Sequence, residues 1–131
     1  MIYEYRVIFG DTDLMGVVYY ANYLRMFEGA RAEYWRSLGR SYKDLEAARI
    51  AMPVVEAHCR YRRPAMYEDL LAVETEVTEM RGASMRFEYV VRRGGEKLAD
   101  GFTRHAMIGP NGIPVRIPEF MRALVVVRPL T

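Results

Sequence analysis

Two aspartates, Asp11 and Asp13, are the residues of this chain with the clearest capacity for chemistry. They stand with Gly16 in an otherwise apolar segment, directly before residues whose spacing predicts a helix from about Tyr20. The N–H groups at a helix start favour negative charge, so they can hold a carboxylate in its charged form and polarise a carbonyl oxygen. One loop could therefore supply a catalytic base and an oxyanion hole.

Two other interpretations of these aspartates compete with catalysis. Both carboxylates could simply accept hydrogen bonds from N–H groups at a turn and a helix start, which residue type alone favours. A calcium loop is the second, because Asp11, Asp13 and Gly16 fall on its positions 1, 3 and 6. Position 5 is Met15, which has no oxygen donor, and position 12 is Asn22, which is a weaker ligand than the usual glutamate. We therefore expect no metal.

Nucleophilic sites based on serine or cysteine are not indicated. The sequence has no Gly-x-Ser-x-Gly motif, and His58 and Cys59 are neighbours in a predicted strand, so they point to opposite faces. His105 lies in the alternating segment 98–108 on the face opposite Phe102, and we expect a structural role for it.

Arginines gather at two predicted strand ends and suggest phosphate contacts. Arg60, Arg62 and Arg63 cluster beside Pro64, and Arg81 precedes Gly82 at a predicted hairpin. Guanidinium groups bind phosphate in a bidentate manner, although solvated strand ends are the more frequent explanation of such clusters.

Hydrophobic patterning predicts the elements that must position these residues. Alternation over 2–9 predicts a strand, and helical spacing from about Tyr20 to Leu38 predicts a long helix with a broad buried face, ended by Gly39. A short helix over 41–48 follows. The remaining predicted elements are strands at about 51–63, 71–78, 85–91 and 98–108, a helical turn at 118–121, and a terminal strand over 124–127.

Together these elements predict an α+β architecture, with an antiparallel sheet of five to six strands wrapped around one long central helix. The length of 131 residues corresponds to one domain, 1–131. The long strands near 70–80 and 83–93 are expected to pair with another copy of the chain and to give a homodimer.

Composition excludes several classes of function. The chain is 51% hydrophobic, so disorder is not indicated. The net charge is only +2, and acidic residues are interspersed with basic ones along the chain, so nucleic-acid binding is not indicated either. No apolar stretch approaches the roughly 18 residues of a membrane-spanning helix. The single Cys59, with no leader before Met1, predicts a cytoplasmic location.

Several short stretches carry a resemblance over about residues 3–108: Phe9-Gly10-Asp11-Thr12-Asp13, Gly16-Val17-Val18-Tyr19-Tyr20-Ala21-Asn22-Tyr23, Phe27-Glu28, Ala30-Arg31, Pro64-Ala65, Asp69-Leu70-Leu71 and Glu79-Met80-Arg81-Gly82-Ala83-Ser84-Met85. In this order they closely resemble the signature of the hotdog-fold acyl-CoA thioesterases, within the 4-hydroxybenzoyl-CoA thioesterase family and its YbgC-type branch. The resemblance implies a long helix wrapped by an antiparallel sheet, dimers joined at their sheet edges, and active sites at the subunit interface.

The resemblance also implies roles for individual residues. Asp13 matches the catalytic carboxylate, Asp11 shapes the loop, and the main-chain N–H of Tyr20 polarises the thioester carbonyl. YbgC-type relatives often carry His at the position of Tyr20, which leaves Asp13 with less side-chain assistance here. The substrate-binding residues expected are Gly16, Val17, Val18, Tyr23 and Phe27, with Arg81, Gly82 and Ser84 near coenzyme A.

The function that these observations predict is hydrolysis of an acyl-CoA thioester. Asp13 either activates water or attacks the carbonyl to form a mixed anhydride, and the sequence leaves both routes open. We expect no cofactor apart from coenzyme A as part of the substrate, an acyl carrier protein as a candidate partner, and a homodimer or homotetramer. The alternative is a non-catalytic protein that binds acyl thioesters or an acyl carrier protein. A hotdog dehydratase is disfavoured because His58 and His105 lie far from the loop.

Overall fold

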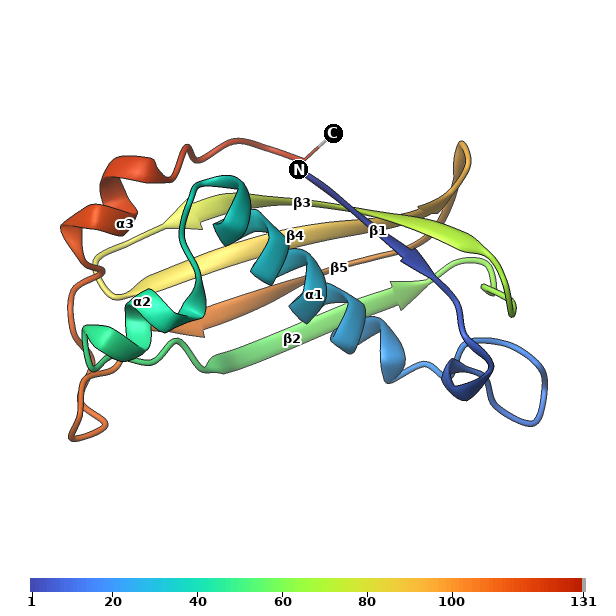
Figure 1. Cartoon of the computed structure of the whole chain (residues 1–131), viewed down its shortest axis with the longest axis horizontal. Helices are drawn as coiled ribbons and strands as arrows, with labels where there is room; N and C mark the ends of the chain where they lie inside the picture. Colours follow the sequence, from blue (N-terminus) through green and yellow to red (C-terminus); the bar gives the residue numbers. More distant parts are fainter. Residues whose placement is uncertain (131) are drawn as a thin grey trace.

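A computed structural model describes residues 1–130, so only the last residue of the predicted 1–131 domain lies outside the described residues. Five antiparallel strands form one sheet in the order β1-β3-β4-β5-β2, which curves around one long helix (Figure 1). This confirms the predicted α+β architecture at five strands. The strands are β1 (Ile2–Arg6), β2 (Val54–Tyr61), β3 (Leu70–Met80), β4 (Ser84–Arg93) and β5 (Glu96–Ala106).

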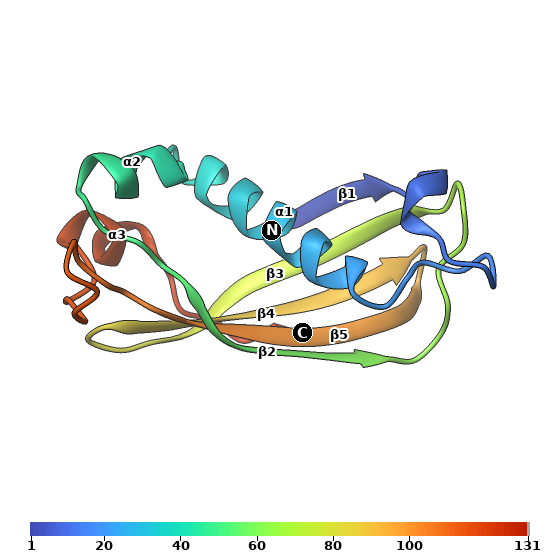
Figure 2. The ribbon, with the colours of Figure 1, turned by 90° about the horizontal axis from the view of Figure 1, so that it is seen from below.

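Helix α1 (Asn22–Ser37) lies along one face of the sheet (Figure 2). Its predicted apolar face is confirmed at Tyr23, Phe27, Ala30, Tyr34 and Trp35, which are buried, whereas Leu24 is exposed. The predicted end at Gly39 is also confirmed: this residue has φ +77°, and the N–H of Arg40 donates to the Trp35 carbonyl. In the described part of the chain no helix is long and apolar enough to cross a membrane.

The core lies between α1 and the sheet, mainly against the interior strands β3 and β4. Phe27 of α1 is fully buried and stacks on Tyr89 with ring centroids 4.1 Å apart. Burial of each such side chain contributes about 1.5–3 kcal/mol to folding. The alternation predicted for these strands is confirmed, since the inward positions are Leu71, Val73, Thr75 and Val77 on β3 and Met85, Phe87, Tyr89 and Val91 on β4.

The chain beyond β5 differs from the sequence prediction. The predicted strand over 124–127 is wrong, because Glu119–Leu124 forms helix α3 and no strand follows it within the described residues. Met121 anchors this helix in the core, and the N–H of Val125 still donates to the Met121 carbonyl. The segment then passes the sheet with one backbone hydrogen bond, from Arg128 to Val77.

Two further boundaries are shorter than predicted. The first strand ends at Arg6, and Phe9–Asp11 forms a 3-10 turn, so Phe9 is exposed. The helix predicted over 41–48 is confirmed as α2 (Tyr42–Ala47), where Ser41 and Asp44 form the reciprocal cap of a capping box.

The free edges of the sheet are not the strands expected to pair with another copy. β3 and β4 are interior, each flanked by two neighbours, so that expectation is wrong. The edges are β1 and β2, and β2 is exposed along almost all of its eight residues. An edge-to-edge assembly must therefore use β1 or β2.

Candidate active site

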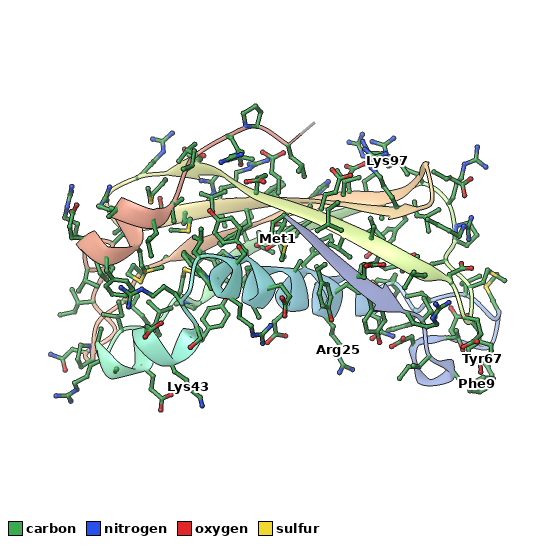
Figure 3. All side chains as sticks on the ribbon, turned by 45° about the horizontal axis from the view of Figure 1, so that its top comes forward. Met1, Phe9, Arg25, Lys43, Tyr67 and Lys97 are labelled. Atoms are coloured by element: carbon green, nitrogen blue, oxygen red, sulfur yellow. The ribbon has the colours of Figure 1, made fainter. Side chains whose placement is uncertain are left out.

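Asp13 lies in the tight loop that joins the 3-10 turn to α1, at the end of the molecule where Figure 3 shows Phe9 and Tyr67. Its Oδ1 accepts a hydrogen bond from the Met15 N–H at 2.8 Å, and its main-chain N–H donates to the Val17 carbonyl at 2.9 Å. Gly16 closes the loop with φ +80°, a conformation that glycine adopts without strain. Within residues 1–130 the Asp13 carboxylate makes no ion pair, so Oδ2 is available for a substrate or a water.

Asp11 has a different environment from Asp13. It is buried, and its Oδ2 accepts hydrogen bonds from the Tyr5 hydroxyl at 2.8 Å and the Ile8 N–H at 2.9 Å. Its carbonyl oxygen accepts from the Tyr19 N–H and from the Asn22 side chain, both at 2.9 Å. These four bonds agree with the loop-shaping role expected for Asp11.

A cleft of about 320 Å³ opens beside Asp13. Its wall is mainly apolar and aromatic, with polar groups at few points, as is usual for small-molecule sites. The structure thus brings together Asp13 and four of the other predicted site residues. The lining residues are Asp13, Val17, Val18, Tyr20, Tyr23, Tyr61, Arg62, Arg63 and Pro64.

The start of α1 forms part of this cleft. The Asn22 N–H donates to the Tyr19 carbonyl at 2.9 Å, and Ala21 caps the helix without a side-chain hydrogen bond. Within the described chain, the main-chain N–H groups of Tyr20 and Ala21 have no backbone acceptor. Unpaired N–H groups at the positive end of a helix are the donors that an oxyanion requires.

Phe27 does not line the cleft, which corrects the prediction for this residue. Its side chain has no exposed surface, because helical spacing directs it onto Tyr89 in the core. Tyr23, one turn earlier, does reach the cleft, and its ring meets the Tyr61 ring at 5.1 Å.

The predicted coenzyme A residues Arg81, Gly82 and Ser84 lie at the opposite end of the sheet from the Asp13 loop, at the β3–β4 turn (Figure 1). Arg81 forms an ion pair with Glu79, and the Arg81 and Gly82 carbonyls accept hydrogen bonds from Arg122. Within one chain these residues are not brought together with Asp13. Gly16 lines a second hollow, which Asp13 also lines.

Sequence reasoning missed Tyr61. Its hydroxyl donates to the Tyr20 carbonyl at 2.8 Å, and its ring forms one wall of the cleft. Nothing in the sequence distinguishes a tyrosine with this role from any other tyrosine at the end of a strand. Arg62 and Arg63, noted as candidate phosphate ligands, do lie at the cleft, each in an ion pair, with Asp100 and Glu96 respectively.

The remaining candidates for chemistry are structural. His105 is buried, with Nε2 at 2.8 Å from the Thr103 hydroxyl and Nδ1 at 3.1 Å from the Met52 carbonyl. Burial lowers the pKa of His105 to about 4, and the nearby Arg31 acts in the same direction. Burial also raises the pKa of the Cys59 thiol to about 11, which disfavours the nucleophilic thiolate. Among residues 1–130 no group of three His, Cys, Asp or Glu side chains is arranged to hold a metal.

Comparison with known proteins places this geometry in context. The model of the thioesterase-like superfamily matches residues 7–125. The Acyl-CoA thioesterase YbgC of Haemophilus influenzae is 38% identical over 120 residues, covering 90% of this chain and 88% of the relative. A solved structure of a hypothetical protein from Aquifex aeolicus aligns with a TM-score of 0.92 at 32% identity, covering 96% of this chain and 99% of that chain. The DHNA-CoA thioesterase of Staphylococcus aureus aligns with a TM-score of 0.88 at 30% identity, covering 93% and 86%.

Proposed function

This chain belongs to the thioesterase-like superfamily, in its YbgC-type hotdog branch, and on that premise we propose that it hydrolyses an acyl-CoA thioester to a free acid and coenzyme A. The observation that carries the proposal is the shared cleft: Asp13, free of any ion pair within residues 1–130, lines it together with Tyr20 at the start of α1. We propose Asp13 as the catalytic carboxylate and the Tyr20 main-chain N–H as the oxyanion donor.

The proposed oxyanion hole uses the backbone, and the Tyr20 phenol takes no part in it. As the carbonyl carbon becomes tetrahedral, negative charge develops on its oxygen, and an N–H at the positive end of α1 stabilises that charge. The sulfur of coenzyme A leaves as a thiolate, which is a good leaving group. A strong general acid is therefore not obligatory, which suits a cleft without histidine among its lining residues.

Asp13 has two routes to the same products. In one, it removes a proton from water, the water oxygen attacks the carbonyl carbon, and the C–S bond breaks to release the thiolate. In the other, the carboxylate attacks the carbonyl carbon, the thiolate leaves, and water hydrolyses the mixed anhydride. Unlabelled acid after a single turnover in H₂¹⁸O would identify the second route, because only water attack on the Asp13 carbon of the anhydride leaves an Asp13 oxygen in the acid.

The cleft also limits the acyl group. Val17, Val18 and the rings of Tyr23 and Tyr61 form an apolar wall that suits a small aliphatic or aromatic acyl chain. An acyl carrier protein could present the same thioester in place of coenzyme A. We assign the protein to the reducing cytoplasm, which the single, half-buried Cys59 suits.

We further propose a homodimer joined at the free edge of β2, with a homotetramer as a higher assembly of the same dimer. Antiparallel pairing of two β2 strands reverses the second sheet relative to the first. The β3–β4 turn of the partner then lies at the same end as the Asp13 loop of the first copy. This assembly would give Arg81, Gly82 and Ser84 a place near coenzyme A that one chain alone does not offer.

Release of free thiol from a panel of acyl-CoA substrates, including butyryl-CoA and benzoyl-CoA, tests the proposed activity. We expect saturable turnover of at least one member. Saturable binding of these thioesters without thiol release would instead support the alternative, a non-catalytic protein that binds acyl thioesters or an acyl carrier protein.

A further inference from the structure

Tyr61 forms a contact between β2 and the start of α1 that the proposed reaction does not by itself require. Its hydroxyl donates a 2.8 Å hydrogen bond to the carbonyl oxygen of Tyr20, across 41 positions of the sequence. The only other donor to this carbonyl within residues 1–130 is the Tyr23 N–H, at 3.4 Å. The shorter bond is the stronger of the two, so the phenol is the main constraint on the Tyr20 carbonyl.

The constraint acts where the backbone has few other restraints. Tyr20 and Ala21 precede α1, and their N–H groups have no backbone acceptor in the described chain. On the preceding side, Val18 is held to the Ala65 carbonyl by a 2.9 Å bond. The Tyr20 carbonyl and the Ala21 N–H belong to the same planar peptide unit. Fixing the carbonyl therefore fixes the orientation of the Ala21 N–H and restrains the backbone dihedrals of Tyr20.

The Tyr61 ring is itself held in place by aromatic contacts. It meets the Tyr23 ring edge to face at 5.1 Å and the Tyr20 ring at 6.4 Å. Burial raises the pKa of Tyr61 well above its ordinary value near 10, so the phenol remains a neutral donor across the physiological range. A protonated phenol can orient a backbone carbonyl without itself transferring a proton.

We infer that Tyr61 is a positioning residue, which orients the helix-start N–H groups toward the thioester carbonyl through its hydrogen bond to the Tyr20 carbonyl. The inference rests on the proposed function and extends it to the edge strand β2. It gives the Tyr61 hydroxyl a role distinct from that of its ring, which forms the apolar wall of the cleft.

The variant Tyr61→Phe tests this role, because it keeps the ring and removes only the hydroxyl. We expect kcat for butyryl-CoA or benzoyl-CoA to fall roughly tenfold, the effect of one lost hydrogen bond, with KM changed less than twofold. The pH–rate profile should keep its shape, since the hydroxyl orients the backbone and transfers no proton. The matched control is Tyr67→Phe, which removes an exposed hydroxyl at the same end of the molecule (Figure 3) and should leave kcat unchanged.

A substrate-independent measurement keeps the inference separate from the proposed function. In ¹⁵N NMR spectra of the free protein, Tyr61→Phe should shift the amide resonances of residues 20–23 and speed their hydrogen exchange, whereas Tyr67→Phe should not. Wild-type kcat in Tyr61→Phe, or unchanged amides at 20–23, would overturn the inference. Failure of the unmutated protein to hydrolyse any acyl-CoA would overturn the proposed function, and the amide shifts would still decide whether Tyr61 orients the start of α1.

Discussion

The Tyr5 hydroxyl donates a 2.8 Å hydrogen bond to Oδ2 of Asp11, and no comparable side-chain donor contacts Asp13 within residues 1–130. This difference separates two carboxylates that stand two positions apart in the sequence. Asp11 is buried and its carboxylate accepts hydrogen bonds within the loop, whereas Asp13 lines the cleft and keeps one carboxylate oxygen free.

Asp13→Asn should reduce turnover of acyl-CoA roughly 100-fold or more, because the amide can neither accept the proton of water nor form an anhydride. Asn retains an oxygen for the Met15 N–H, so the loop should persist. Thiol release and thermal unfolding, measured on the same preparation, check both parts. Retained turnover in Asp13→Asn and also in Asp13→Ala would reject Asp13 as the catalytic carboxylate.

Asp11→Ala should lower the free energy of unfolding by about 1–3 kcal/mol, because it leaves the Ile8 N–H and the Tyr5 hydroxyl without their acceptor. Urea unfolding monitored by tryptophan fluorescence measures the change. Tyr5→Phe is the matched control, and it should cost less because the Ile8 bond remains. Equal stability of Asp11→Ala and the unmutated protein would contradict the loop-shaping role.

A buried chain of hydrogen bonds makes stability depend on the protonation of His105. Because the Met52 carbonyl can only accept, Nδ1 of His105 carries the hydrogen, and Nε2 accepts from the Thr103 hydroxyl. Thr103 then accepts from the Tyr89 hydroxyl at 2.6 Å, which accepts from Arg31 at 3.1 Å. A second proton on His105 would sit on Nε2, where it removes the acceptor of the Thr103 hydroxyl and reverses that bond.

The pH dependence follows from the same geometry. Burial lowers the pKa of His105 to about 4 from 6.5, so between these values the unfolded chain binds more protons than the folded one. The free energy of unfolding should therefore fall as the pH drops from about 6.5 to about 4, by up to roughly 3 kcal/mol. His105→Gln should flatten this slope in urea unfolding series. A slope equal to that of the unmutated protein would show that other groups cause it.

Gly101 of β5 allows the close approach of β2 that places Tyr61 at the cleft. A Cβ at this position would lie 2.1 Å from the His58 carbonyl oxygen, a distance that no backbone atom tolerates. Gly101→Ala should lower the free energy of unfolding by about 2 kcal/mol or more. Gly95→Ala, where a Cβ would meet nothing within 4 Å, should change it by less than about 0.5 kcal/mol. Similar effects of the two substitutions would contradict this packing.

The proposed dimer predicts a mass of about 30 kDa by light scattering, twice the 15.2 kDa of one chain. Val55→Lys places a charge on the exposed edge strand β2 and should shift the mass toward that of one chain. Val126→Lys, also at an exposed valine but outside the sheet, should leave the mass unchanged. An unshifted mass for Val55→Lys would point to assembly through another surface.

Features that depend on neighbouring residues in the sequence were predictable. The helix over about 20–38 and the inward faces of the central strands follow from periodicity, because a helix and a strand each bury one side at a fixed repeat. The Asp11 to Tyr20 segment was predicted as the site because its residue types and its place before the helix are both local. The strand predicted over 124–127 was wrong because the local pattern there is ambiguous. A short apolar run suits a strand, but it also suits the end of a helix such as α3 and the segment after it.

The tertiary structure alone decided which distant residues meet. The sequence determined the loop, the long helix and the alternating strands through local backbone preferences and hydrophobic spacing. Strand order, and with it the exposed edge at β2, depends on contacts between segments far apart in the chain. The Tyr61 hydroxyl therefore bonds to the Tyr20 carbonyl, and the Arg81 turn lies at the other end of the sheet, only in the folded chain. No local sequence pattern specifies which strand lies beside which.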